Sequence, residues 1–456
     1  MLIKVYGSAI SGIVATTITI EVNVDKGINF LLVGLPDNAV KESQQRIASA
    51  LNYYGYKIPG KKIVINMAPA DLKKEGSAYD LPLAIGILGA SEQICTDKLA
   101  DYIVMGELSL DGSLNKIKGA LPIALEAKKQ GFKGIILPKC NAKEAAIVSD
   151  LEVFGADTIL DVINFFDGQN TLERTFIDIH EEFAKSLDNY EFDFIDVKGQ
   201  ESVKRAMEVA AAGSHNIIMV GAPGSGKTML AKRLPSILPP LTIEEALETT
   251  KIHSVAGKMS VNQSIVSVRP FRNPHHTISD TALVGGGSYP QPGEISLAHN
   301  GVLFLDELPE FKRNVLEVLR QPMEERKITI ARTKQTSEYP ASFMLVAAMN
   351  PCPCGYYNHP TQACTCGLGA VNKYLNKVSG PLLDRIDIQL EVVPVPFKEL
   401  STLKEGESSE VIRKRVIEAR KIQQERFKDY PDIHCNAQMN TALMKKFCKI
   451  QPSGME

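Results

Sequence analysis

The sequence predicts an α/β protein in which two successive α/β domains are followed by a partial helical lid. Strand-like and helix-like runs alternate along the first third of the chain, and the alternation resumes after residue 196. In the second series, strand, loop and helix follow one another repeatedly, which is the pattern of a doubly wound parallel sheet. The segment after residue 395 is mostly helical in pattern.

The first domain is expected at 1–165, with strands at 18–24, 62–66 and 134–137 and helices at 40–51 and 120–129. A polar, acidic stretch at 166–195 is the predicted linker, with room for a short helix at 172–187. The parallel-sheet domain is expected at 196–395, where a helix at 201–212 leads into an apolar strand at 216–220. The partial lid is expected at 396–456.

The composition argues against a strongly basic protein and against a membrane-spanning one. The chain has 456 residues, 44% of them apolar, and a formal net charge of −2. A strongly basic surface is therefore excluded for the whole protein, although a local basic channel is not. No apolar run approaches the roughly 18 residues of a membrane span, and residues 17–24 alternate like a strand and not like a signal peptide. We therefore expect a cytoplasmic protein with no membrane contact.

A phosphate-binding loop is predicted directly after the strand at 216–220. The octapeptide there fits the pattern G-x-x-x-x-G-K-[ST] and opens a helix, as this motif requires. Its glycines let backbone N–H groups turn toward phosphate oxygens, and the helix N-terminus adds positive potential. Lys227 is expected to reach the β- and γ-phosphates of ATP, and Thr228 the Mg²⁺ ion. The predicted ATP-binding residues of this loop are Gly221, Ala222, Pro223, Gly224, Ser225, Gly226, Lys227 and Thr228.

Two carboxylates end a second apolar strand, about eighty residues after the phosphate loop. The run Val302-Leu-Phe-Leu-Asp-Glu307 places Asp306 and Glu307 at the carboxyl end of that strand. In a parallel sheet this end faces the nucleotide crevice. Asp306 is therefore expected to hold the Mg²⁺ shell, and Glu307 to polarise the attacking water as general base or positioner.

A third apolar strand, at 343–349, ends at Asn350. A polar side chain at this point can orient the water against the γ-phosphate. The alternative is a turn-forming asparagine before Pro351.

Four of the eight cysteines form two C-x-C pairs, Cys352 with Cys354 and Cys364 with Cys366. Without an export signal, such a cluster favours metal over disulfides. Four thiolates arranged as a tetrahedron suit Zn²⁺ and leave no open position for chemistry. The alternatives are unmetallated thiols, or His359 inside the loop as a substitute ligand.

Two adjacent histidines, His275 and His276, do not indicate a metal site. Neighbours on an extended chain point to opposite faces, so one ion rarely takes both. We expect a structural or hydrogen-bonding role.

These motifs together resemble a known family. The phosphate loop, the Asp306-Glu307 pair, Asn350 and the segment 382–385 occur in the order of an AAA+ ATPase. The sequence is similar to the ComM/YifB family of magnesium-chelatase-like AAA+ proteins through both predicted domains. The stretches that carry this similarity are 269–277, 292–301, 350–355 and 379–387.

The resemblance implies a homo-oligomeric, hexameric ring. It also implies a motor that acts on branched or single-stranded DNA, without sequence preference, in recombination and natural transformation. Arg385 would then reach into the ATP site of the neighbouring subunit as a catalytic residue. From charge pattern alone, pairing of Arg385 with Asp384 or Asp387 is the alternative.

Two insertions follow from the same resemblance. The Gly- and Pro-rich stretch 278–296 suits a projecting hairpin, and 328–341 alternates like a second hairpin. In related helicases such hairpins line the central pore, so Arg332 and Lys334 are candidate DNA-phosphate contacts. The alternative is two solvated charges on a surface strand.

The first domain resembles the proteolytic domain of Lon protease, through the stretches 34–41, 74–81, 106–112 and 134–138. Ser77 lies near the position of the Lon nucleophile, but Ile123 stands where the family has the base lysine. An apolar side chain cannot deprotonate serine. We expect a catalytically dead adaptor or DNA-facing module, and not an active protease.

The family pattern also includes a later helix whose arginine touches the γ-phosphate. We do not place that arginine here, and expect either an incomplete chain or impaired hydrolysis. Arg413, Arg415 and Arg420 are expected on the solvated face of a lid helix. Rival functions are a magnesium-chelatase-type ATPase subunit, an ATP-dependent protease, and a nucleotide-gated scaffold without motor activity. DNA-stimulated ATP hydrolysis would separate the motor from all three.

Overall fold

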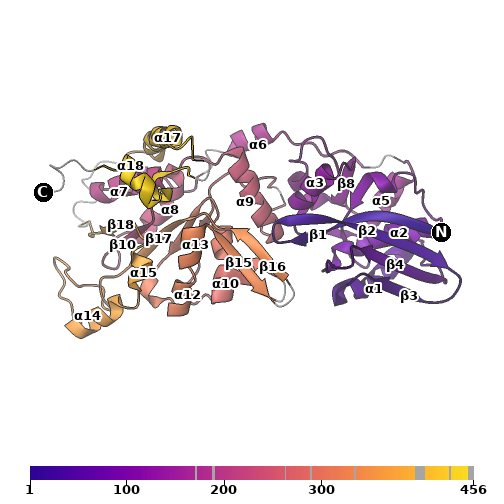
Figure 1. Cartoon of the computed structure of the whole chain (residues 1–456), viewed down its shortest axis with the longest axis horizontal. Helices are drawn as coiled ribbons and strands as arrows, with labels where there is room; N and C mark the ends of the chain where they lie inside the picture. The colour runs from indigo at the N-terminus through magenta and orange to yellow at the C-terminus, as the bar shows by residue number, and fades with distance from the viewer. Residues whose placement is uncertain are drawn as a thin grey trace. The chain divides into compact units, whose positions relative to one another are not determined.

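The computed structural model describes residues 1–449 except 170–171, 187–189, 262, 288–289, 333–334, 396–405 and 431–432 (Figure 1). The chain divides into two compact units. The first contains Met1–Lys185 and Ala246–Val266, and the second contains Ser186–Glu245 and Ser267–Glu456. A segment from the middle of the sequence thus packs with the N-terminal part of the chain. The domain boundaries expected from the sequence remain predictions.

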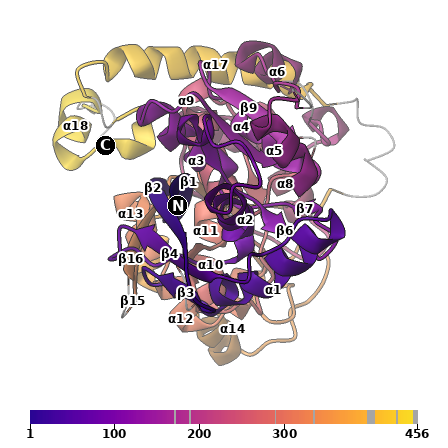
Figure 2. The ribbon, with the colours of Figure 1, turned by 90° about the vertical axis from the view of Figure 1, so that its right-hand side faces the viewer.

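The first unit is built on a seven-stranded sheet with strand order β3-β4-β2-β1-β5-β8-β9 (Figure 2). Its two longest strands form an antiparallel hairpin that turns at Gly12, whose φ of 62° suits glycine. The strands that run parallel to their neighbours include β5, β8 and β9. The strand bounds are β1 Leu2–Ser11, β2 Val14–Asp25, β3 Phe30–Val33, β4 Lys62–Ala68, β5 Tyr102–Val104, β8 Gly134–Pro138 and β9 Glu152–Ala156, with a small ladder of β6 Glu107–Leu108 and β7 Leu114–Asn115.

The helices of the first unit lie where the sequence alternates helix-like and strand-like runs. Those at Asn38–Tyr53 (α1) and Ala120–Lys129 (α3) cover the predicted helices at 40–51 and 120–129. The others are α2 Asp80–Ala90, α4 Lys139–Ala145, α5 Ile159–Phe166 and α6 Ile179–Ser186, with short 3₁₀ turns η1 Ser77–Tyr79 and η2 Leu99–Asp101. Ile123 is buried in α3, and the Ser77 hydroxyl hydrogen-bonds to the Glu107 carboxylate. The likeness to the Lon fold remains a prediction.

The second unit holds a five-stranded sheet with order β11-β14-β17-β10-β18, and every adjacent pair is parallel. The strands are β10 Ile217–Val220, β11 Phe271–Arg272, β14 Val302–Leu305, β17 Met344–Met349 and β18 Ile388–Glu391. This is the predicted parallel-sheet fold of a phosphate-loop protein. Because all strands share one direction, their carboxyl ends meet at the same edge of the sheet.

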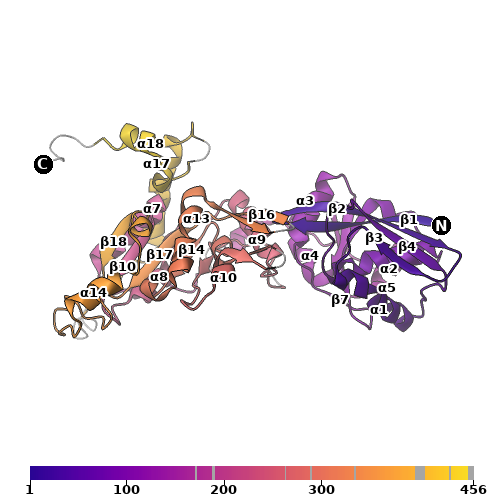
Figure 3. The same cartoon turned by 60° about the horizontal axis from the view of Figure 1, so that its bottom comes forward.

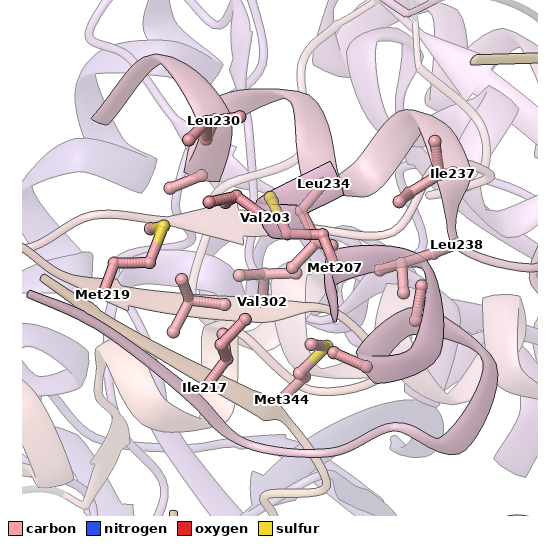
Figure 4. Close-up of a cluster of buried hydrophobic side chains, with 14 of the residues drawn as sticks. Val203, Met207, Ile217, Met219, Leu230, Leu234, Ile237, Leu238, Val302 and Met344 are labelled. Atoms are coloured by element: carbon pink, nitrogen blue, oxygen red, sulfur yellow. The ribbon is translucent and has the colours of Figure 1, made fainter. Parts of the chain in front are cut away.

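Two helices pack on this sheet through a continuous apolar core. Helix α7 (Glu201–Gly213) contributes Val203 and Met207, and α8 (Lys227–Ile237) contributes Leu230 and Leu234. Figure 4 shows these side chains meeting Ile217, Val302 and Met344 from three different strands. Complete burial of such side chains stabilises the domain by roughly 1.5–3 kcal/mol each, which fixes α8 and the loop before it on the sheet.

Helix α9 (Ile243–Val255) begins in the second unit, and its residues from Ala246 onward belong to the first unit. The short helices of the second unit include α12 Arg313–Glu317, α13 Arg320–Glu325, α14 Leu368–Leu375 and α15 Gly380–Leu383, with 3₁₀ turns η3 Phe194–Asp196 and η4 Leu308–Glu310. None of the helices in the described part of the chain is both long and apolar enough to cross a membrane.

Both predicted insertions contain a hairpin, and Figure 3 labels β16 (Gln335–Pro340) of the second. The first lies between α10 (Asp280–Val284) and α11 (Glu294–Leu297) and pairs β12 (Gly285–Gly286) with β13 (Gln291–Pro292). The second pairs β15 (Lys327–Arg332) with β16 (Gln335–Pro340). The Tyr339 hydroxyl donates to the Pro290 carbonyl at 2.7 Å, so the two hairpins are joined. Lys334 and the Arg332 side chain lie outside the described residues.

The C-terminal segment contains α17 (Ser409–Arg426), the 3₁₀ turn η5 (Asn436–Gln438) and α18 (Thr441–Phe447). The expectation of a solvated face is wrong for Arg420. Its guanidinium donates to the carbonyls of Ala211 and Ala212, at 3.0 and 2.9 Å, at the end of α7. Unpaired helix carbonyls attract a cation, so Arg420 caps α7, and burial lowers the pKa of its guanidinium.

Candidate nucleotide and metal sites

The predicted phosphate loop connects β10 to α8 at the carboxyl edge of the sheet. A Cβ on residue 221 would lie 2.3 Å from the Val392 carbonyl oxygen, so only glycine fits there. Gly224 and Gly226 have φ of 77° and 91°, and Gly226 caps α8. These three glycines therefore allow the tight turn that brings backbone N–H groups to the start of a helix.

Lys227 is held at the mouth of this loop. Its Nζ donates to the carbonyls of Gly221 and Ala222, at 2.7 and 3.0 Å, and lies 3.3 Å from Asn350 Oδ1. Burial lowers the pKa of its ammonium. The hydroxyl of Ser225, also in the loop, is buried and has no hydrogen-bond partner among the described residues. A buried ammonium and an unpaired buried hydroxyl at one loop fit a phosphate ligand.

The two residues expected to hold Mg²⁺ are in direct contact. Thr228 Oγ1 donates to Asp306 Oδ2 at 2.7 Å, joining the start of α8 to the end of β14. A hydroxyl and a carboxylate are hard oxygen ligands, the type that Mg²⁺ prefers beside a nucleotide phosphate. Thr228 and Asp306 therefore fit the Mg²⁺ ion that accompanies ATP.

Glu307 follows Asp306 in a left-handed backbone conformation, with φ of 54°. Its N–H donates to Asp306 Oδ1 at 3.0 Å, and its carboxylate is more than half exposed. The carboxylate lies 3.2 Å from His276 Nδ1. This contact was not predictable from the sequence, because a histidine 31 residues before the glutamate follows no recognisable spacing. His276 is the candidate that orients Glu307, and the ring of His275 lies tilted against it, with 4.1 Å between the ring centroids.

Asn350 directly follows β17, which lies between β14 and β10 in the sheet. Its side chain therefore stands between the carboxylates of one neighbouring strand and the phosphate loop of the other. The contact with Lys227 places it toward the phosphate loop. This is the position from which an amide can orient water at a γ-phosphate, and the water-orienting role remains a prediction.

Arg385 lies at the opposite edge of the sheet. Its carbonyl accepts from Asn216, which precedes β10, whereas the phosphate loop follows β10. A four-residue strand spans roughly 13 Å, so Arg385 is separated by the depth of the sheet from its own phosphate loop. Its ion-pair partner is Glu324 on α13, and not Asp384 or Asp387. Asp387 instead accepts from the Asn216 N–H at 3.1 Å.

The four clustered cysteines converge after Asn350. All four Sγ atoms lie within 4.8 Å of one another, and Cys352 Sγ lies 3.3 Å from that of Cys354 and 3.7 Å from that of Cys364. Sulfurs of a tetrahedral Zn²⁺ site stand roughly 3.8 Å apart, given Zn–S bonds of about 2.3 Å. The cluster can therefore hold a metal ion, with Cys366 as the fourth ligand.

The surroundings of Cys354 favour a thiolate. Backbone N–H groups of Tyr356 and Thr365 hydrogen-bond to Cys354 and lower the pKa of its thiol to about 5, whereas desolvation and the neighbouring thiols raise the pKa values of Cys364 and Cys366. His359 is not part of the ligand group, and its Nδ1 accepts from the N–H groups of Thr361 and Gln362 at 3.2 and 3.1 Å. The cysteines alone therefore form the candidate zinc site.

Protein purified without chelators is expected to carry about one zinc ion per chain, because four converging thiolates fill its coordination shell. The double substitution Cys352→Ser with Cys354→Ser should abolish this content, since it removes half of the ligands. Elemental analysis measures it, with Cys95→Ser, an exposed cysteine outside the cluster, as the matched control. Wild-type protein free of zinc would refute the assignment.

Family models cover most of the chain. A model described as "Magnesium chelatase, subunit ChlI" matches residues 193–400. A second, "Subunit ChlI of Mg-chelatase", matches 20–141, and a third, "Magnesium chelatase, subunit ChlI C-terminal", matches 406–456. All three models come from the same type of chelatase subunit, in chain order.

Curated relatives match over nearly the whole length. YifB of Escherichia coli, an uncharacterized protein, is 46% identical over 98% of this chain and 86% of its own. Competence protein ComM of Haemophilus influenzae is 44% identical over the same shares of the two chains. The magnesium-chelatase 67 kDa subunit of Chlorobaculum parvum is 25% identical, over 35% of this chain and 23% of its own. On this similarity the chain belongs to the ComM/YifB family of magnesium-chelatase-like proteins.

Proposed function

We propose that this protein is an ATP-hydrolysing AAA+ motor that acts on branched or single-stranded DNA as a hexameric ring. The observation that carries the proposal is that the residues expected to bind phosphate, hold Mg²⁺, orient water and activate water assemble at one sheet edge. Lys227 and Asn350 stand together, the Thr228–Asp306 pair lies beside them, and Glu307 follows Asp306. Membership of a magnesium-chelatase-like family supports the same chemistry.

Each residue at this edge has a role in cleaving the bond between the β- and γ-phosphates. Lys227 and the backbone N–H groups of the loop would hold the phosphates, and Thr228 and Asp306 would hold Mg²⁺, which neutralises developing charge on the phosphate oxygens. Glu307 would take a proton from the attacking water as the water oxygen bonds to phosphorus. His276, at 3.2 Å, would keep the Glu307 carboxylate aimed at that water.

The DNA part of the proposal has two supports. One relative is a competence protein by name. The second is the hairpin pair, in which Tyr339 joins the β15–β16 hairpin to the Gly-rich insertion. If this pair lines the pore of a ring, Arg332 and Lys334 would contact DNA phosphates. Such contacts are independent of sequence and are weakened by salt.

The test is ATP hydrolysis and migration of a synthetic four-way DNA junction, measured at low salt with and without DNA. We expect DNA to stimulate hydrolysis and ATP to drive migration, with Lys227→Ala inactive in both. A protein that hydrolyses ATP but neither binds DNA nor responds to it would instead be a chelatase-type ATPase subunit, the function named in the description of the family model. Binding of ATP without hydrolysis would leave a nucleotide-gated scaffold.

The double substitution Arg332→Ala with Lys334→Ala should remove DNA stimulation and junction migration, while hydrolysis without DNA continues. Losing two phosphate contacts weakens sequence-independent binding and lowers its salt dependence by about two counterions. Lys327→Ala is the matched control, since Lys327 lies at the base of the same hairpin and pairs with Glu338 at 3.1 Å. Junction migration at the wild-type rate in the double variant would refute the pore assignment.

A further inference from the structure

The loop that carries the four clustered cysteines (residues 351–367, the cysteine loop) contacts the phosphate loop (residues 221–228). A Cβ on residue 355 would lie 2.5 Å from Pro223 Cδ and 2.7 Å from its Cγ, so the Gly355 backbone packs directly on the phosphate loop. Gly355 has φ of 86°, and its N–H donates to the Cys352 carbonyl at 3.0 Å. The turn that carries the first two thiols is therefore the turn that abuts Pro223.

A hollow beside the phosphate loop is lined by both loops. It has a volume of about 360 Å³, with Gly221 and Ala222 from the phosphate loop, Gly355 and Tyr357 from the cysteine loop, and Val392 after β18. A displacement of the cysteine loop therefore changes the wall of a hollow that opens on the first residues of the phosphate loop.

The same segment is tied to Asn350. Cys352 follows Asn350 by two residues, and the Asn350 side chain contacts Lys227 at 3.3 Å. Past the last cysteine, α14 returns to this point, where the Tyr374 hydroxyl hydrogen-bonds with the Asn350 backbone N–H. The cysteine segment thus contacts the nucleotide machinery at the phosphate loop and at Asn350.

Little besides the sulfur cluster holds this segment in shape. Residues 351–367 contain no helix or strand. Only two of these residues, Cys352 and Gly355, are buried. A loop with so little apolar interior depends on a metal for its fold, because ligand binding supplies the free energy that burial does not.

We propose that the cysteine cluster is a zinc clamp on the phosphate loop. Zn²⁺ held by Cys352, Cys354, Cys364 and Cys366 keeps Gly355 against Pro223 and Asn350 beside Lys227, and so sets the affinity for ATP. This inference rests on the proposed ATP binding. Coupling between two sites is reciprocal, so bound ATP also tightens the hold on zinc by the same factor.

The experiment measures the dissociation constant of a fluorescent ATP analogue with Mg²⁺, for zinc-loaded protein and for protein stripped by a chelator that is then removed. If the loop keeps its position in about a tenth of the stripped molecules, apparent affinity falls about tenfold. Re-addition of Zn²⁺ should restore it, which separates the clamp from irreversible unfolding. As the reciprocal readout, the analogue should slow zinc release to a chromogenic chelator.

Two variants sharpen the test. In Cys352→Ser with Cys354→Ser, the chelator should have no effect, because the zinc is already lost. Gly355→Ala keeps all four thiols, and should retain zinc yet bind the analogue about tenfold more weakly, since its Cβ displaces Pro223. Cys95→Ser should match wild type in both measurements.

Equal nucleotide affinity in stripped and loaded protein overturns the clamp alone, as does wild-type affinity in zinc-loaded Gly355→Ala. Zinc-loaded protein that fails to bind the analogue overturns the proposed function, and the clamp with it. The two failures are therefore distinguishable in the same titration.

Discussion

Replacing Glu307 by glutamine should lower ATP turnover by about 100-fold or more while ATP still binds. Glutamine keeps the shape of the side chain but cannot take a proton from water, and general-base catalysis contributes roughly 10² to 10⁴ in rate. The substitution changes neither Thr228 nor Asp306, which are in contact at 2.7 Å, so the residues expected to hold Mg²⁺ remain. Steady-state phosphate release and equilibrium binding of an ATP analogue measure the two effects separately.

Two comparisons assign the loss to the carboxylate. Lys227→Ala should show the opposite signature, with ATP binding itself lost, because the ammonium between the loop and Asn350 is removed. Glu317→Gln is the matched control, since Glu317 is an acid of α12 that pairs with Arg320. Turnover in Glu307→Gln close to that of wild type would mean that another group activates the water.

The sequence was most informative where chemistry is local. A phosphate loop needs a glycine at each tight backbone position and a lysine at the first turn of a helix, and all of these are consecutive in the chain. The contact of Thr228 with Asp306, 78 residues apart, was also predictable. Strands of one parallel sheet bring their carboxyl ends to one edge whatever the length of the connections.

Contacts without a period or a motif were not predictable. His276 reaches Glu307, Glu324 pairs with Arg385, and Arg420 caps α7, and each contact depends on how separate elements pack. The expectation of a solvated face for Arg420 was wrong because the periodicity of one helix does not report how that helix packs against α7. The membership of segment 246–266 in the first unit is a tertiary result of the same kind.

Arg385 offers the second large effect. Its guanidinium is tied to Glu324 and to the Pro381 carbonyl, and its Nε has no hydrogen-bond partner among the described residues. Because it stands at the sheet edge opposite its own phosphate loop, we propose that it acts on a nucleotide bound by another subunit. An arginine supplied in this way contributes roughly 10³ to 10⁵ in rate, so Arg385→Ala should be nearly inactive and still bind ATP. Arg205→Ala, a largely exposed arginine paired with Glu208, should behave as wild type.

Mixing tests the subunit that Arg385 serves. Arg385→Ala and Lys227→Ala are each expected to be inactive, but an interface between them can combine an intact phosphate loop with an intact arginine. In a random one-to-one mixture, half of the loops and half of the arginines are intact, so roughly a quarter of the interfaces regain both. Hydrolysis should then return to as much as about a quarter of the wild-type rate. A mixture that exchanges subunits and stays inactive would count against a role of Arg385 in the neighbouring site.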